Sequence, residues 1–401
     1  MNTLFQIVIS RLAEKRAERE QARQRPPGRW IRCHCGSPIF FNNSYCLACH
    51  ATLGYVPSLL EVRSFLPGDG PDEWRLAASE GITVPLPLVG RTWRRCGNFD
   101  SPAGCNWMVE VGEPWGYCVA CRLNRMIPDL SDPANGVRWR KVEAAKRRLI
   151  AQLLELGLPV RPKSEDPWRG LAFEFLATLP GQARVMTGHV EGVITLNVEE
   201  ADDVMREQIR TAMNEPYRTL LGHFRHEIAH HYWDQLIAPT PWLDAFRNVF
   251  GDERVDYAAA LQRHYANPPV PDWPLRHVTA YASVHPWEDW AETWAHYLQI
   301  VDTLATAVGF GLGANDVDFQ AAPFAVEALH DTGDPGAESF LAMINSWVEL
   351  TAVLNELARS LGQRDLCPFV LSNTAVAKLH FVHLVVTRET ELQTPGDFLR
   401  H

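Results

Sequence analysis

Eight of the nine cysteines lie in two groups of four within the first third of the chain, and this arrangement strongly constrains the fold. Four thiolates bind one zinc ion tetrahedrally, so each group predicts one structural zinc site. Modules this small bury too little apolar surface to fold alone, and the metal would supply the missing folding free energy. The first group is Cys33, Cys35, Cys46 and Cys49, and the second is Cys96, Cys105, Cys118 and Cys121.

The two cysteine groups differ in regularity. The first begins with a Cys-x-Cys pair, which is tighter than the common Cys-x-x-Cys, so His34 stays open as an alternative ligand. The second ends in a regular Cys-x-x-Cys pair at Cys118, which could also suggest a redox motif. However, no βαβ pattern surrounds that pair, and a redox role would leave two cysteines unexplained. We expect the ninth, Cys367, to be a small buried apolar residue.

The composition is that of a soluble globular protein large enough for two or three domains. The chain has 401 residues, of which 46% are hydrophobic and 21% charged. Its net charge of −10 gives no bulk attraction to nucleic acid or to anionic membranes. The N-terminus lacks a secretory pattern and no stretch is apolar enough to span a bilayer. We therefore expect a cytoplasmic protein with no membrane partner, in which thiols bind metal and do not form disulfides.

The pattern along the chain predicts an α+β protein. Four-cysteine zinc-ribbon modules come first, followed by a mostly helical domain with a small sheet. Three short β-type runs, at 171–176, 184–189 and 193–198, precede a helix that we expect to run from about Pro216 to Gln235. The predicted parts are a charged helix at 1–29, a zinc ribbon at 30–66, a second four-cysteine module at 67–132 and the helical domain at 133–401.

The predicted helix after the sheet carries the sequence His226-Glu227-Ile228-Ala229-His230, which is the H-E-x-x-H pattern. Residues four apart on a helix lie one above the other, so both imidazoles can bind the same ion. Glu227 follows the first histidine, where its carboxylate could take a proton from a water bound to that ion. An ordinary amphipathic helix is the alternative. The apolar face of this helix nevertheless lies away from His226, Glu227 and His230.

A catalytic zinc needs a third protein ligand, and Glu288 and Glu292 are the best candidates. They lie one turn apart on a helix that we expect to begin at Pro286. Acidic residues are also common in any first helical turn, which leaves a purely structural role open. The extended spacing of metzincins is absent after His230. Weaker candidates for the third ligand are His264, His277, His285 and His296.

Taken together, these motifs resemble those of bacterial zinc-binding metallopeptidases that carry an N-terminal zinc ribbon. The resemblance rests on both cysteine groups, the stretch 222–233 and the stretch 285–292. The wider gluzincin class implies a zincin-like domain in which Glu288 is the third ligand and Glu292 hydrogen-bonds a ligand histidine. By position it also implies Tyr281 as the group that stabilises the oxyanion, with His285 as a competitor. The run 193–198 would then be the edge strand that holds the substrate peptide.

The resemblance implies hydrolysis of a peptide or isopeptide bond in a peptide or protein substrate, with one catalytic and two structural zinc ions. Glu227 would be the general base. A protein without catalytic activity is a weaker alternative, since a scaffold does not need Glu227. Another alternative is a zinc-ribbon module that binds nucleic acid or protein and processes what it binds. Its support is the basic residues at 91–95 and 138–148, although the overall acidity opposes it.

Overall fold

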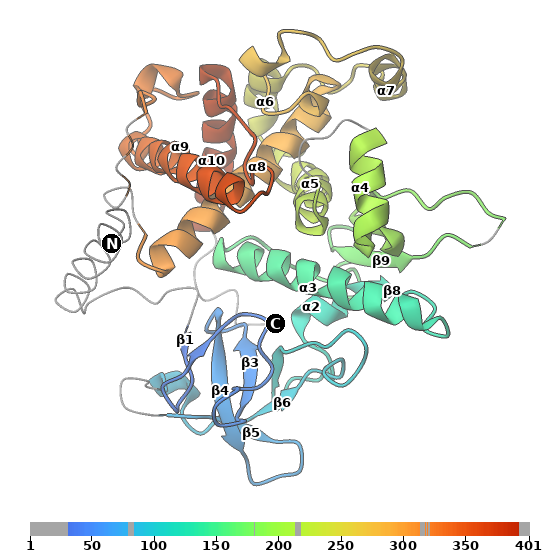
Figure 1. The fold of residues 1–401 in the computed structure, drawn as a ribbon, viewed down its shortest axis with the longest axis vertical. Helices are drawn as coiled ribbons and strands as arrows, with labels where there is room; N and C mark the ends of the chain where they lie inside the picture. Colours follow the sequence, from blue (N-terminus) through green and yellow to red (C-terminus); the bar gives the residue numbers. More distant parts are fainter. Residues whose placement is uncertain are drawn as a thin grey trace, which may run out of the picture.

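The computed structural model describes residues 31–78, 84–179, 181–212, 218–312, 317, 319 and 321–392. The charged helix predicted at 1–29 lies outside these residues. A sheet-rich N-terminal part and a helical part lie on either side of the long helix α3, Pro133–Glu155 (Figure 1). The mixed fold and the order of its parts confirm the predicted class, with N-terminal four-cysteine clusters and a helical C-terminal domain.

The first cysteine group is built on a small hairpin. Strands β1, Ile31–Arg32, and β2, Pro38–Ile39, pair in antiparallel fashion, and the Cys33–Cys35 pair lies in the turn between them. Gly36 closes this turn with a positive φ of 86°, a conformation that L side chains rarely adopt. Phe40 and Phe41 follow β2 in a turn and are not part of the strand.

A five-stranded antiparallel sheet connects the two cysteine groups. Its strands follow one another in sequence order, and Tyr55 also forms a bridge with Trp107, so the first and last strands meet. The backbone N–H of Tyr55 donates to the Asn106 carbonyl at 2.9 Å, which closes the sheet into a small barrel. The predicted division after residue 66 falls inside β4, Glu61–Pro67. The strands are β3 Thr52–Val56, β4 Glu61–Pro67, β5 Trp74–Leu76, β6 Trp93–Arg95 and β7 Met108–Glu110, with a 3-10 turn at Leu86–Leu88.

The second cysteine group leads directly into the sheet of the helical part. Helix α2, Val119–Arg122, carries Cys121, and strand β8, Asn124–Met126, follows at once. This strand pairs with β9, Ala172–Leu176, in a four-stranded sheet. The Phe173 N–H also donates to the Leu123 carbonyl at 2.7 Å. The second cysteine module is therefore continuous with the domain that carries the H-E-x-x-H helix.

The four-stranded sheet has the order β10-β11-β9-β8 and differs from the prediction in two ways. The run predicted at 184–189 forms only the short strand β10, Gly188–Val190. The run predicted as the edge strand forms β11, Val193–Asn197, which lies between β10 and β9 and is an interior strand. Strand β10 occupies the edge because the two-residue turn Glu191-Gly192 folds it back against β11.

Helix α5, Leu220–Tyr232, carries the H-E-x-x-H residues. It begins four residues later than predicted because Thr219 caps it, accepting a hydrogen bond from the Gly222 N–H. A π-helical turn, Trp233–Ile237, follows it. The remaining helices are α4 Asp203–Ala212, α6 Trp242–Phe250, α7 Tyr257–Ala266, α8 Pro286–Gly309, α9 Ala337–Ser360 and α10 Asn373–Leu392. Short turns of 3-10 helix lie at Val198–Ala201, Trp273–Leu275, Tyr281–Ser283 and Val326–Ala328.

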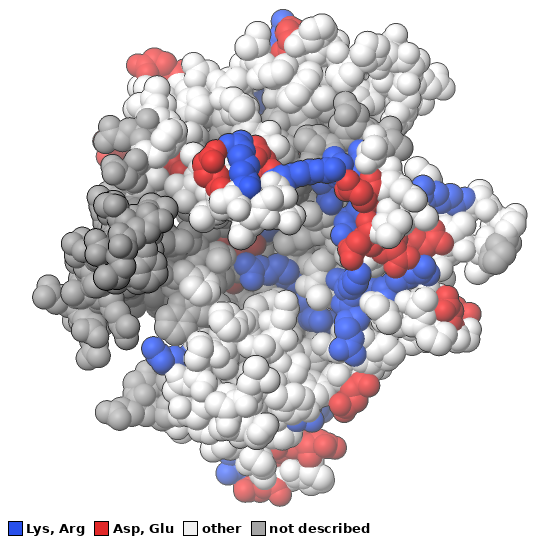
Figure 2. All heavy atoms as spheres, viewed as in Figure 1, with Lys and Arg blue, Asp and Glu red and all other residues white. Residues whose placement is uncertain are grey.

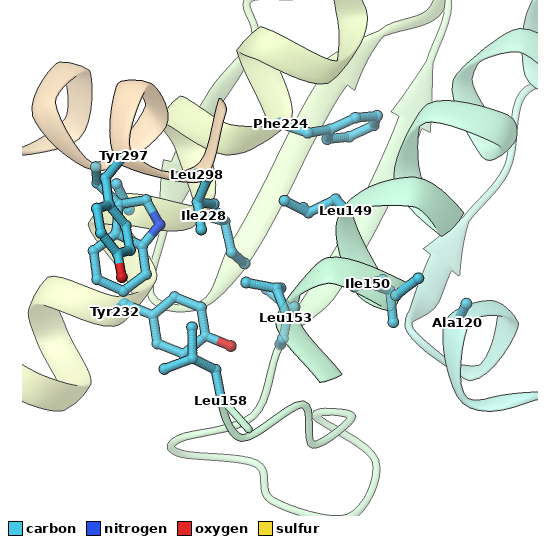
Figure 3. Close-up of a cluster of buried hydrophobic side chains, with 14 of the residues drawn as sticks. Ala120, Leu149, Ile150, Leu153, Leu158, Phe224, Ile228, Tyr232, Tyr297 and Leu298 are labelled. Atoms are coloured by element: carbon cyan, nitrogen blue, oxygen red, sulfur yellow. The ribbon is translucent and has the colours of Figure 1, made fainter. Parts of the chain in front are cut away.

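Three helices, α3, α5 and α8, enclose the main core. Leu149 and Leu153 of α3 are fully buried against Phe224 and Ile228 of α5 (Figure 3). The Trp290 indole of α8 donates to the Ala229 carbonyl of α5 at 2.8 Å. The Tyr232 ring of α5 also stacks on the Trp294 ring of α8, so α5 and α8 are packed directly against each other. No helix among the described residues is long and apolar enough to cross a membrane.

Candidate metal centre

The two histidines of α5 lie on one face of the helix, as their four-residue spacing predicts. Their ring centroids are 5.2 Å apart. The His226 side chain is 13% exposed and that of His230 is 5% exposed. Burial lowers the pKa of His230 to about 3, so this imidazole is neutral near neutral pH. A neutral imidazole is the form that binds a metal ion.

Glu288 reaches the same point from the first turn of α8. Its Oε2 lies 3.1 Å from His226 Nε2, and its Oε1 lies 3.9 Å from His230 Nε2. Although burial opposes ionisation, the hydrogen bond and charge of His226 lower the pKa of Glu288 to about 2. The three side chains thus converge on one point with a negative carboxylate between two imidazoles.

This donor set fits zinc. Nitrogen and oxygen ligands of a tetrahedral zinc ion are about 2.0–2.2 Å from it, and therefore lie roughly 3.3–3.6 Å from one another. The two distances from Glu288 to the histidines bracket this range, and all three ligand atoms lie within 4.8 Å of one another. Both histidines use Nε2 toward the centre. Two histidines and one carboxylate leave the fourth position of a tetrahedral site to water or substrate.

Glu292 lies beside the site and holds one ligand in place. Its Oε1 is 2.7 Å from His226 Nδ1, and its Oε2 accepts a hydrogen bond from the Thr279 hydroxyl at 2.7 Å. This contact places the His226 proton on Nδ1 and directs Nε2 toward Glu288. A carboxylate in this position orients a ligand imidazole and increases its basicity. Glu292 is therefore a neighbour of the site, and Glu288 is the carboxylate that faces its centre.

We expect Glu292→Ala to weaken zinc binding at this site by about 10- to 100-fold, because His226 loses the acceptor that fixes its orientation. Competition with a zinc chelator of known affinity would measure the change. Glu338→Ala, which removes an exposed carboxylate from α9, is the matched control and should leave the affinity unchanged. An unaltered affinity in Glu292→Ala would contradict the assigned role.

Glu227 is buried in the same face of α5, with 9% of its surface exposed. Burial raises its pKa, and the nearby Glu288 carboxylate adds to this effect, while His226 and His223 oppose it. A carboxylate with a raised pKa is a stronger base than an ordinary glutamate. The burial of Glu227 therefore suits its carboxylate to accepting a proton.

Two tyrosines lie near the centre, and the sequence analysis named only one of them. The ring centroid of Tyr281 is 6.0 Å from that of His226. Tyr257 at the start of α7 was missed, yet its hydroxyl donates to Glu288 Oε1 at 2.6 Å. No local pattern pointed to it, because it lies 31 residues before Glu288. Only the folding of α7 against the start of α8 brings the two together.

His285 does not compete with Tyr281 for a place at the centre. It is the N-cap of α8, and its Nδ1 accepts a hydrogen bond from the Trp287 N–H at 3.1 Å. Its Nε2 lies 3.0 Å from the Val255 carbonyl, to which it donates. Both ring nitrogens are therefore used in holding the first turn of α8, and hence Glu288, in position. The structure corrects the alternative role considered for this residue.

Each cysteine group also comes together in space. In the first group, Sγ–Sγ distances are 3.5 Å for Cys33 to Cys49 and 3.6 Å for Cys35 to Cys46. In the second group, Cys105 and Cys118 are 3.7 Å apart. Thiolates around one zinc ion lie about 3.8 Å apart, whereas a disulfide requires about 2.05 Å. These distances fit two zinc sites, and all four cysteines of the second are buried.

The basic residues that suggested nucleic-acid binding are largely engaged within the protein. Each basic residue of the cluster at 138–148 forms an ion pair with an acidic side chain or donates a hydrogen bond to a backbone carbonyl. On the face shown in Figure 2, Lys and Arg side chains lie beside Asp and Glu side chains over the region of α3 and α4. The partners are Asp202 for Arg138, the Pro102 carbonyl for Arg140, Asp203 for Lys141, Glu143 for Lys146, the Ala103 and Gly104 carbonyls for Arg147, and Asp302 for Arg148.

Comparison with known families matches both parts of this architecture. Residues 135–385 match the family described as "Putative zinc-binding metallo-peptidase". This chain belongs to that family. Residues 30–132 match a zinc-ribbon domain, a span that includes both cysteine groups. The family model thus covers the two helices that supply His226, His230 and Glu288, and it supports zinc as the metal.

Similar chains occur in mycobacteria. Uncharacterized proteins of Mycobacterium bovis and of two Mycobacterium tuberculosis strains are each 40% identical over 354 residues. The matched region covers 88% of this chain and 93% of each relative. No solved structure is significantly similar to the chain.

Proposed function

We propose that the protein is a zinc-dependent peptidase that hydrolyses a peptide or isopeptide bond. The observation that carries this proposal is the convergence of His226, His230 and Glu288 beside the buried carboxylate of Glu227. A scaffold would need the three ligands but would have no use for a base with a raised pKa. Membership of the metallopeptidase family supports the same reaction class.

The residues divide the chemistry among them. Zinc bound by the three ligands supplies Lewis acidity, which acidifies water and polarises a carbonyl. Glu227 takes the proton of the attacking water and passes it to the leaving nitrogen. Tyr281 donates a hydrogen bond to the developing oxyanion, and burial raises its pKa, which keeps its hydroxyl protonated. Tyr257 fixes the orientation of Glu288 through their hydrogen bond.

Strand β10 is the place for an extended substrate. It is the edge of the four-stranded sheet nearest α5, and its outer side is not paired with another strand among the described residues. An extended peptide can add to such an edge by main-chain hydrogen bonds. This replaces β11, which the sequence suggested and which is an interior strand. The substrate would then lie between β10 and the metal-binding face of α5.

Cleavage of an unfolded protein, followed by mass spectrometry of the products, tests the proposal. We expect the zinc-loaded protein to cleave denatured casein into peptides. Removal of the weakly held metal by a chelator should abolish cleavage, and stoichiometric zinc should restore it. Absence of cleavage by the zinc-loaded protein across denatured proteins and isopeptide-linked conjugates would overturn the proposed function.

A further inference from the structure

The imidazole of His189, on the edge strand β10, lies beside the metal centre but is not one of its ligands. Its ring is nearly parallel to that of His230, at 26°, with the centroids 6.1 Å apart. It also contacts the ring of His231, 6.2 Å away. In the β10–β11 register His189 is opposite Ile194, which is fully buried, so both side chains lie on the α5 side of the sheet.

The turn that follows β10 determines which ring nitrogen of His189 carries the proton. His189 Nε2 accepts a hydrogen bond from the Gly192 N–H at 2.9 Å. A neutral imidazole that accepts at Nε2 must carry its hydrogen on Nδ1. Because Nε2 accepts this hydrogen bond, it carries no proton and the ring is uncharged. The turn therefore leaves Nδ1–H as a neutral donor.

This donor has no acceptor among the described residues. His189 Nδ1 is buried, and no hydrogen-bond partner is found for it there. Buried polar groups are nearly always paired, because an unpaired donor costs about 1–3 kcal/mol. A donor left without an acceptor beside a reaction centre is suited to a ligand that brings its own acceptor. An uncharged donor can be satisfied by an uncharged acceptor such as an amide carbonyl, without any ion pair.

The main-chain N–H and C=O of His189 are also available to a ligand that lies along β10. The turn Glu191-Gly192 has two residues, so the pair that flanks it, Val190 and Val193, exchanges hydrogen bonds across the hairpin. The next pair, His189 and Ile194, is then a non-hydrogen-bonded pair. The N–H and C=O of His189 therefore point away from β11, toward the unpaired side of β10.

We propose that His189 is a substrate-positioning residue, whose Nδ1–H donates to a backbone carbonyl of the peptide that lies along β10. This inference rests on the proposed peptidase function. The His189 side chain would add one hydrogen bond to a backbone carbonyl of the peptide. This bond comes in addition to the main-chain pairing that any edge strand offers. The contact lies next to His230, so it sets the position of the peptide relative to the metal centre.

Calorimetric titration of the zinc-loaded protein with two kinds of probe tests this role. Acetohydroxamate contacts only the metal centre. Peptidyl hydroxamates carry the same metal-binding group attached to a dipeptide. The dipeptides have apolar, basic or acidic side chains, and the hydroxamate is attached at either the N-terminal or the C-terminal end. His189→Phe removes both ring nitrogens. Replacement of His189 by Nδ1-methylhistidine removes only the Nδ1–H and keeps the acceptor for Gly192. His330→Phe is the matched control, because His330 is far from His189 in the sequence and its ring packs against Phe381.

We expect both His189 variants to bind the preferred peptidyl hydroxamate about 3- to 10-fold more weakly, the range of one hydrogen bond, with acetohydroxamate affinity unchanged. Unchanged peptide affinity in both variants would overturn the proposal. A parallel loss for acetohydroxamate would also overturn it, since His189 would then act through the metal centre. If no peptidyl hydroxamate binds the wild-type protein more tightly than acetohydroxamate, the proposed function itself fails, and this inference with it.

Discussion

Replacement of Glu227 by Gln is expected to lower kcat for peptide hydrolysis by about 10²- to 10⁴-fold, the range attributed to one general acid–base group. The amide of Gln has nearly the same shape but cannot accept a proton at neutral pH. Glu227 is not one of the three side chains whose ligand atoms converge at the centre. Zinc content should therefore stay at the wild-type value, and the loss should appear in kcat.

Two controls make this result interpretable. Metal analysis of the same Glu227→Gln sample establishes that the centre is loaded. Glu338→Gln on α9 removes an exposed carboxylate of the same chemistry and should keep full activity. Full activity in Glu227→Gln would show that another group takes the proton. A loss of both zinc and activity would instead show that Glu227 helps to bind the metal.

The second large effect concerns the number of metal ions. Three groups among the described residues could hold an ion, so the wild-type protein should carry about three zinc ions per chain. Glu288→Ala removes the carboxylate that lies between His226 and His230 and should lower the count to about two. Both cysteine clusters should retain their zinc because thiolates bind this ion strongly. Hydrolysis should be lost together with the third ion.

Glu292→Ala is the natural comparison for Glu288→Ala, since both residues lie on one face of α8. Glu292 contacts the outer nitrogen of His226 and does not face the centre. At saturating zinc the Glu292→Ala protein should therefore still bind about three ions per chain. Only its affinity for the ion held by His226, His230 and Glu288 should be weaker. The reverse outcome, with the third ion lost in Glu292→Ala and kept in Glu288→Ala, would contradict the assignment of the third ligand.

Local spacing was sufficient to predict much of the site. His226 and His230 share a face because an α-helix places residues four apart above one another. In the first group and at Cys118–Cys121, cysteines separated by one or two residues are close whatever the rest of the fold does, which pointed to both clusters. Cys96 and Cys105 lie farther apart in the sequence and are brought together by the fold. Glu288 and Glu292 were also placed one turn apart on a helix beginning at Pro286, where α8 begins. For the two histidines and the two glutamates, the relevant geometry lies within one or two turns of a single helix.

Predictions that depended on how distant segments pair were less successful. The run 193–198 was recognised as a strand, but alternation of side chains does not reveal which strand lies at the edge. Strand β8, at residues 124–126, was not expected at all, because it pairs with a strand almost 50 residues later. Tyr257 was missed for the same reason. The two cysteine modules were separated at residue 66, which lies inside β4, and β4 pairs with β5 in the same sheet.

The sequence by itself therefore determined which residues are candidates for metal binding and which helices carry the candidate catalytic ligands, since these depend on spacing within a single element. Only the tertiary structure decided that Tyr257 holds Glu288, that His285 caps α8, and that β10 with His189 forms the edge beside the centre. Such contacts join residues tens of positions apart. They arise where the start of α7 packs against the start of α8 and where β10 packs against α5.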